Sequence, residues 1–270
     1  MKKGIFLKIF VAITYLGMIV VNALSNILPI NGNNTGQVSN AYPNLFAPAA
    51  LTFSIWGVIY FLLAAYTLYQ FGLFQKDGGQ KNASLFTEVG TYFAATSLAN
   101  ILWIFSWHYH FIAFSLVFML VILFYLIKIN SILRKEKLSS KENFFIKAPF
   151  SVYFSWITVA TIANVTTLLV SLNWTGWGIS PAIWTIIILI IGAFIGLFRT
   201  LTDKNIFYGL VLVWAYFGIW FKHTSATGFN SQYPLIINTL IVLELLFLIA
   251  LGSLVFRKSF PDPLHKNHQK

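Results

Sequence analysis

The side chains that could do chemistry in this chain lie inside strongly apolar segments, where a polar group is costly to bury. The only acidic residue deep in such a segment is Glu244, within the apolar run 240–247. Since burial in hydrocarbon favours the uncharged acid, Glu244 is interpreted either as a proton-accepting or ligand-contacting group, or as a hydrogen-bond partner of a neighbouring helix. The residues one helical turn away are apolar, so any partner must come from another helix.

Three further stripes combine large aromatic side chains with asparagine. They are Trp56 with Tyr60, Asn100 with Trp103 and Trp107, and Trp156 with Ala160 and Asn164. Residues three, four, seven or eight apart share one face of a helix. Asparagine avoids lipid because its amide needs partners, so these faces are expected to point into the bundle. They are interpreted either as packing with interhelical hydrogen bonds or as the wall of a ligand cavity.

Catalysis and metal binding have little support. The chain contains no Cys, which excludes disulfides and thiolate sites. His108 and His110 point apart if they are helical, so they are interpreted as interfacial residues rather than ligands. The sequence shows no Ser/His/Asp arrangement, paired carboxylates or Gly-rich phosphate loop. We therefore expect no catalytic residue, no metal ion, no resident cofactor and no enzymatic activity.

Composition indicates the elements that carry these residues. The 270 residues are 58% hydrophobic and only 9% charged, against about 25% charged in soluble domains. About 20 apolar residues cross a bilayer as a helix. Continuous apolar runs predict an all-α, polytopic transmembrane bundle of about eight helices, at 6–28, 47–72, 86–107, 111–132, 148–172, 182–199, 205–221 and 233–256. Prolines near the first turns favour helix starts there: Pro48, Pro149, Pro181 and Pro234.

The basic residues predict how the bundle is oriented. All 18 Lys and Arg except Lys222 fall on one side of these spans, which is typical of cytoplasmic loops. We therefore expect a multi-pass plasma-membrane protein with both termini cytoplasmic, and the net charge of +11 needs no nucleic-acid partner. The first span is favoured as an uncleaved helix over a signal peptide. Gly192 and Gly196 predict close helix packing, and Trp107, Trp174, Trp177 and Trp220 are expected near the outer boundary.

At the aromatic stripes the sequence resembles the tryptophan-rich sensory protein, or translocator protein (TspO/MBR), family. Segment 46–60 is similar to that family's second-helix motif, with Pro48, Trp56 and Tyr60 in register. The family's Asn-x-x-Trp on helix three is matched by Asn100 and Trp103. Its Trp-x-x-x-Ala-x-x-x-Asn on helix five is matched by Trp156, Ala160 and Asn164.

The resemblance implies a receptor-like protein that binds a flat apolar ligand, such as a porphyrin, a haem-like tetrapyrrole or a sterol, between its helices. It covers about residues 1–173, which predicts a five-helix core, a three-helix extension at 174–256 and a basic cytoplasmic tail at 257–270. The expected ligand-binding residues are Trp56, Tyr60, Asn100, Trp103, Trp156, Asn164 and Glu244. The first alternative is a small-molecule transporter that uses Glu244 as its coupling acid, and the second is an assembly or scaffold subunit whose helices serve only to pack on a partner. The expected partners are the lipid bilayer and the ligand, and a homodimer stays open.

Overall fold

The computed structural model describes residues 2–75 and 82–259, and within them the chain is helical, with no strand. Eight of the described helices are long and apolar enough to cross a membrane, as the sequence predicts. They are α1 (Lys2–Ile27), α3 (Ile55–Tyr69, preceded by the 3-10 turn η2, Ala50–Ser54), α4 (Ala83–His108), α5 (Ile112–Leu133), α7 (Ala148–Ser171), α8 (Pro181–Thr202), α9 (Ile206–Thr224) and α10 (Pro234–Ser259).

Side-chain caps and prolines define where several helices begin. The Ser180 hydroxyl accepts a hydrogen bond from the Ile183 amide at the start of α8, and Asn205 caps α9 in the same way. α8 and α10 start at Pro181 and Pro234, where a missing N–H has no cost. Pro48 differs, because it precedes η2 by two residues rather than starting a helix.

Short helices occupy connections that the apolar pattern left as loops. The connection between α1 and α3 contains η1 (Ile30–Gly32) and α2 (Thr35–Asn40), and η4 (Gly176–Gly178) lies between α7 and α8. The start of α2 is a capping box, in which the side chains of Asn34 and Gln37 each accept a hydrogen bond from the other's backbone amide. At the opposite end, α6 (Ser140–Glu142) and the π-helical turn η3 (Asn143–Lys147) lead into α7.

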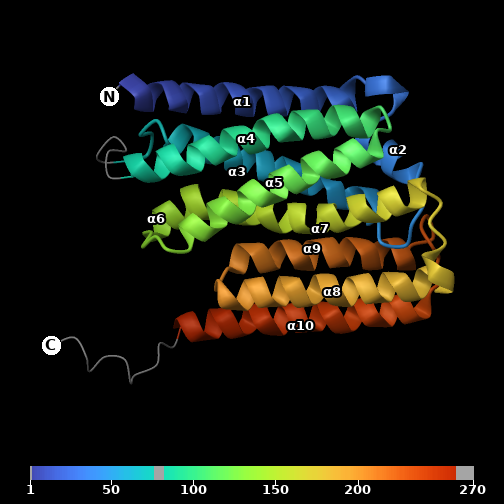
Figure 1. The fold of residues 1–270 in the computed structure, drawn as a ribbon. Coiled ribbons are helices and arrows are strands. Elements are labelled where there is room, and N and C mark those ends of the chain that lie inside the picture. The colour runs from blue at the N-terminus through green and yellow to red at the C-terminus, as the bar shows by residue number, and fades with distance from the viewer. Residues whose placement is uncertain (1, 76–81, 260–270) are drawn as a thin grey trace.

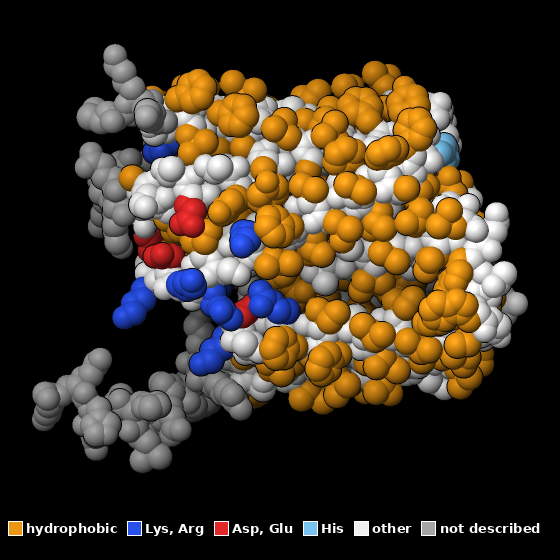
Figure 2. All heavy atoms as spheres, in the orientation of Figure 1, with side chains coloured by type: hydrophobic (Ala, Val, Ile, Leu, Met, Phe, Trp, Pro, Cys, Tyr) orange, Lys and Arg blue, Asp and Glu red, His pale blue; other side chains and the backbone are white. Residues whose placement is uncertain are grey.

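The helices form two adjoining groups. In Figure 1, α1, α3, α4, α5 and α7 lie together, and α8, α9 and α10 lie beside α7, with α9 packed directly on α7. α1 begins and α10 ends at the same end of the bundle. Figure 2 shows the sides covered by hydrophobic side chains, with Lys and Arg gathered at that same end.

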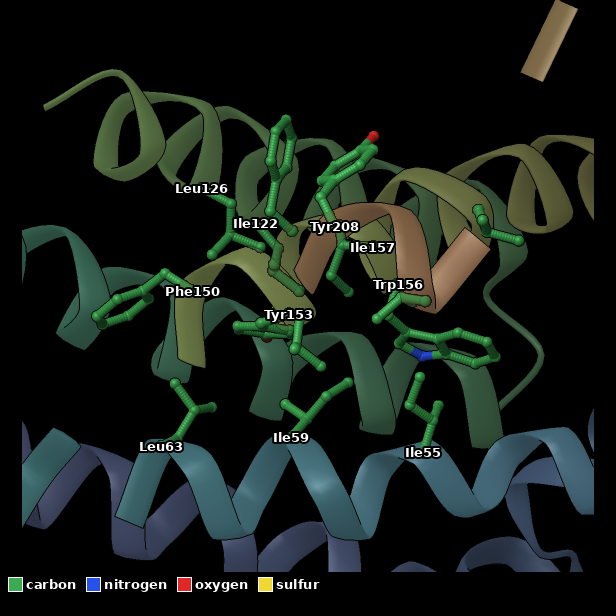
Figure 3. Packing of buried hydrophobic residues seen from close by; sticks show 14 of the residues in the cluster. Ile55, Ile59, Leu63, Ile122, Leu126, Phe150, Tyr153, Trp156, Ile157 and Tyr208 are labelled. Carbon is green, nitrogen blue, oxygen red and sulfur yellow. The ribbon is translucent and has the colours of Figure 1, made fainter. Parts of the chain in front are cut away.

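Small and branched side chains allow the helices to approach closely. A Cβ added at Gly196 would lie 2.5 Å from the Leu212 Cδ1 atom, and one at Gly192 would lie 2.9 Å from the Tyr216 hydroxyl. This confirms the predicted close packing around the two glycines of α8. In the other group, Ile55, Ile59 and Leu63 form one buried face of α3, directed toward α7 in Figure 3.

Candidate ligand-binding cavity

Trp56 lies at the centre of a cluster of aromatic rings near the end of the five-helix group that carries α2. Its ring stacks on Tyr60 of the same helix, with centroids 5.5 Å apart. It also lies 6.3 Å from Trp103 of α4 and 6.3 Å from Trp156 of α7, the latter edge to face. Offset and edge-to-face arrangements of this kind are the preferred geometries of aromatic pairs. The three stripes of aromatic and asparagine residues predicted from the sequence therefore meet in this cluster.

A hydrogen-bond chain holds Trp103 in this cluster. The Trp103 indole Nε1 donates to the Asn164 Oδ1 atom at 3.0 Å, and the Asn164 Nδ2 atom donates to the Ser115 hydroxyl at 3.0 Å. Asn164 is only 2% exposed and Ser115 is fully buried. Since both ends of the Asn164 amide have protein partners, this side chain fixes the Trp103 ring and joins α4, α5 and α7.

Asn100 belongs to a second polar contact, between α4 and α1. The Asn22 Nδ2 atom donates to the Asn100 Oδ1 atom at 2.6 Å and to the Met18 carbonyl at 2.8 Å. The Asn100 Nδ2 atom is buried and has no hydrogen-bond partner among the described residues. Although Tyr15 lies seven residues before it on the same helix, Asn22 was not part of the stripes predicted from the sequence. Its position as a polar residue within an apolar span was the available signal.

The short helix α2 covers the outer end of the cluster. The Trp107 indole donates to the Thr35 carbonyl at 3.1 Å, and the His108 Nε2 atom lies 3.5 Å from the Thr35 hydroxyl. The His108 Nδ1 atom lies 2.8 Å from the Ile104 carbonyl, which can only accept, so Nδ1 carries the proton. Trp107 and His108 are buried at 6% and 0% exposure, and Trp107 stacks on Trp103. Both residues lie at the end of α4, and the burial of Trp107 agrees with the stripe that was expected to point into the bundle.

Two cavities adjoin the cluster and share four lining residues, Thr35, Phe53, Trp56 and Trp103. The inner cavity has a volume of about 50 Å³ and is also lined by Trp107, Trp156 and Asn164. The outer cavity has a volume of about 360 Å³, and its remaining lining is Asn22, Asn26, Asn34, Gly36, Ala50 and Tyr60. Aromatic rings thus form the shared wall, and asparagines form the polar wall of the larger space.

Among the described residues that line the two cavities, two have a buried side-chain polar atom with no hydrogen-bond partner. These atoms are the Trp156 Nε1 atom, on a residue that lines the inner cavity, and the Tyr60 hydroxyl, on a residue that lines the outer one. An unsatisfied buried donor costs free energy, so each can reward a ligand that offers an acceptor.

Glu244 lies apart from this cluster. It is on α10, which packs on α8 and α9 in the second group of helices, and it lines neither aromatic cavity. One of its carboxyl oxygens is buried without a partner among the described residues. The structure therefore brings six of the seven predicted site residues close to one another and places the seventh elsewhere.

Comparison with known families decides the identity of this arrangement. The family model for TSPO-like proteins matches residues 8–253, which is most of the chain. The chain belongs to the TSPO-like protein family. No curated protein and no solved structure matches it. The TSPO-like match begins in α1 and ends in α10, so it includes α8, α9 and α10 as well as the helices that carry the aromatic stripes.

Three hydrogen bonds connect the two helix groups of this TSPO-like protein beside the cavities. The Trp214 indole of α9 donates to the Thr52 carbonyl at 2.9 Å, and the Ala49 amide donates to the Gly218 carbonyl at 3.0 Å. The His223 Nε2 atom donates to the Leu45 carbonyl at 2.9 Å. Segment 45–52 contributes Ala47, Pro48 and Ala50 to the cavity walls. α9 therefore holds one wall of the site.

Proposed function

We propose that this TSPO-like membrane protein is a receptor or sensor that binds a flat, apolar ligand against Trp56. The observation that carries the proposal is that the Trp56 ring lies in the wall of both cavities while contacting Tyr60, Trp103 and Trp156. Family resemblance favours a porphyrin, a haem-like tetrapyrrole or a sterol as the ligand class.

Cavity size favours the outer cavity as the place where binding starts. Small-molecule sites are commonly about 300–1,000 Å³, which includes the outer cavity at about 360 Å³ but excludes the inner one at about 50 Å³. A ligand with several fused rings therefore lies first against Trp56 and Tyr60. It reaches Trp156 only when the Phe53 or Trp56 ring rotates, because these two side chains line both spaces.

The asparagines have different roles in this proposal. Asn22, Asn26 and Asn34 line the outer cavity and offer polar contacts to a carboxylate or hydroxyl at the edge of the ligand. Asn164 acts as a positioning residue, because both ends of its amide are already bonded within the protein. Asn100 similarly holds Asn22 through the contact between α1 and α4.

We further propose that residues 1–173 form the ligand-binding core and that 174–256 stabilise it through α9 and segment 45–52. The Lys- and Arg-rich end is assigned to the cytoplasm of a plasma membrane, because positive charge is retained there. With this orientation α2 and both aromatic cavities lie toward the outer side.

The test is a titration of the detergent-purified full chain with protoporphyrin IX, followed by the absorbance of the porphyrin. Trp56→Ala is expected to weaken binding at least severalfold, because stacking on this ring contributes about 0.5–1.5 kcal/mol beyond burial. Trp177→Ala is the matched control, because Trp177 is 78% exposed and lines neither aromatic cavity. Saturable binding that Trp56→Ala leaves unchanged would overturn the proposed site. If a sterol binds and the porphyrin does not, the proposed binding site is kept and the ligand class is restricted to sterols.

A further inference from the structure

A second large cavity lies at the opposite end of the bundle from the aromatic cluster. Its volume is about 610 Å³, and it lies where η3 at the start of α7 meets the turn between α8 and α9 and the last part of α10. One part of its wall is polar or basic and the other is apolar. The polar and basic lining residues are Ser140, Asn143, Lys147, Lys204 and Asn205, and the apolar ones are Phe144, Ile206, Phe207 and Leu254.

The charge around this cavity is positive. Lys147 and Lys204 line it, and no acidic side chain is among its lining residues. The nearby Asp203 carboxylate is already paired with Arg134 at 3.4 Å and with Arg199 at 3.1 Å. The Glu142 carboxylate accepts hydrogen bonds from the Asn82 side chain at 2.7 Å and from the Ser139 amide at 2.8 Å. The Asp203 carboxylate also acts electrostatically on Lys147, but its ion pairs are with the two arginines, so Lys147 and Lys204 keep the charge at the cavity wall positive.

The two lysines approach the cavity from different helix groups. Lys147 is half-buried at the end of the π-helical turn η3, a kind of distortion that is frequent at functional sites. Lys204 is exposed in the turn between α8 and α9 and has a φ of 47°. An anion between them would contact both groups of helices at the end where Figure 2 shows Lys and Arg side chains gathered.

We propose that this cavity binds an anionic phospholipid. The phosphate lies against Lys147 and Lys204, and the upper part of an acyl chain lies against Phe207 and Leu254. A free phosphate ion would need only the polar wall. The apolar wall beside the lysines matches the acyl chain of a lipid. The cavity also lies at the ends of α8 and α9, where a membrane-spanning helix reaches the headgroup region. Basic pockets between helices on the cytoplasmic side commonly bind lipid headgroups.

The experiment is native mass spectrometry of the detergent-purified full chain with phosphatidylglycerol or phosphatidylcholine carrying the same acyl chains. Phosphatidylglycerol is expected to bind more tightly. Lys147→Gln/Lys204→Gln is expected to bind it about thirtyfold more weakly, from the usual contribution of two lysines near an anionic lipid. The matched control is Lys135→Gln/Lys137→Gln, which removes two exposed lysines that do not line the cavity. It is expected to bind as the unmodified chain does.

Further measurements keep the result interpretable. The lipid-free melting temperature of each variant reports on folding, and the single change Lys204→Gln leaves all buried packing in place. Lys147→Arg/Lys204→Arg keeps the charge and is expected to keep the lipid preference. Equal binding of the two lipids, or equal loss in both double Gln variants, would overturn the proposal. Inorganic phosphate that binds as tightly as the lipid and displaces it would show a free-anion site instead.

Discussion

The Trp103 indole donates its hydrogen bond to the Asn164 side chain across 3.0 Å, although the two residues belong to α4 and α7. This bond connects an aromatic wall of the cavities to a polar contact that also includes Ser115 of α5. These hydrogen bonds therefore fix how α4, α5 and α7 are rotated about their own axes at one level of the bundle. The position of the Trp103 ring depends on a residue that does not need to contact the ligand.

Replacing Asn164 is expected to lower both stability and ligand affinity. Asn164→Ala leaves the Trp103 Nε1 donor without its partner, which costs about 1–3 kcal/mol and frees the Trp103 ring, whereas the Ser115 hydroxyl still donates to the Ile112 carbonyl. Thermal unfolding and porphyrin titration measure the two effects. Asn130→Ala is the matched control, because Asn130 is a buried asparagine bonded to the Leu126 and Phe150 carbonyls away from the cavities. A control that loses as much affinity would show that Asn164 acts only through general stability.

Removing one of the three hydrogen bonds between α9 and segment 45–52 is expected to loosen the cavity wall. Trp214→Phe deletes the donor to the Thr52 carbonyl, so amide hydrogen exchange in 45–52 should increase and ligand affinity should fall modestly. Trp220→Phe is the matched control. The Trp220 indole lies on the same helix and has no hydrogen-bond partner among the described residues, so this change removes no hydrogen bond. Unchanged exchange in Trp214→Phe would contradict a supporting role for α9.

Glu244→Gln separates binding from transport. Glu244 lines neither aromatic cavity, so protoporphyrin titration of this variant is expected to match that of the unmodified chain. The alternative function, a transporter coupled through Glu244, instead predicts that flux into proteoliposomes depends on pH and is lost in this variant. Loss of such flux with porphyrin binding intact would establish transport as a separate activity.

Enlarging Gly196 is expected to destabilise the second helix group. In Gly196→Ala the new Cβ would lie 2.5 Å from the Leu212 Cδ1 atom, so Leu212 must shift. Overpacking of this kind costs about 1–3 kcal/mol. Gly57→Ala is the control, because nothing lies within 4 Å of a Cβ there, and a helical alanine is favoured by about 0.5–1 kcal/mol. Melting temperatures should therefore move in opposite directions, and a shift of the same sign in both variants would contradict this packing.

The sequence by itself determined the number of spans and the helix faces that carry the aromatic and asparagine stripes. A membrane-spanning helix satisfies its own backbone groups and needs only a continuous apolar run, so local composition is sufficient to locate it. The spacing of Trp156 and Asn164 likewise places both on one side of α7 wherever that helix lies.

Only the tertiary structure decided which helices meet. It placed Asn22 of α1 on Asn100 of α4 and covered Trp107 with α2. It also placed Glu244 in a different helix group from the aromatic cluster. Contacts between helices depend on shape and on hydrogen bonds between residues far apart in the chain. An apolar helix can present any of several faces to lipid. Its composition therefore does not determine which helices it packs against.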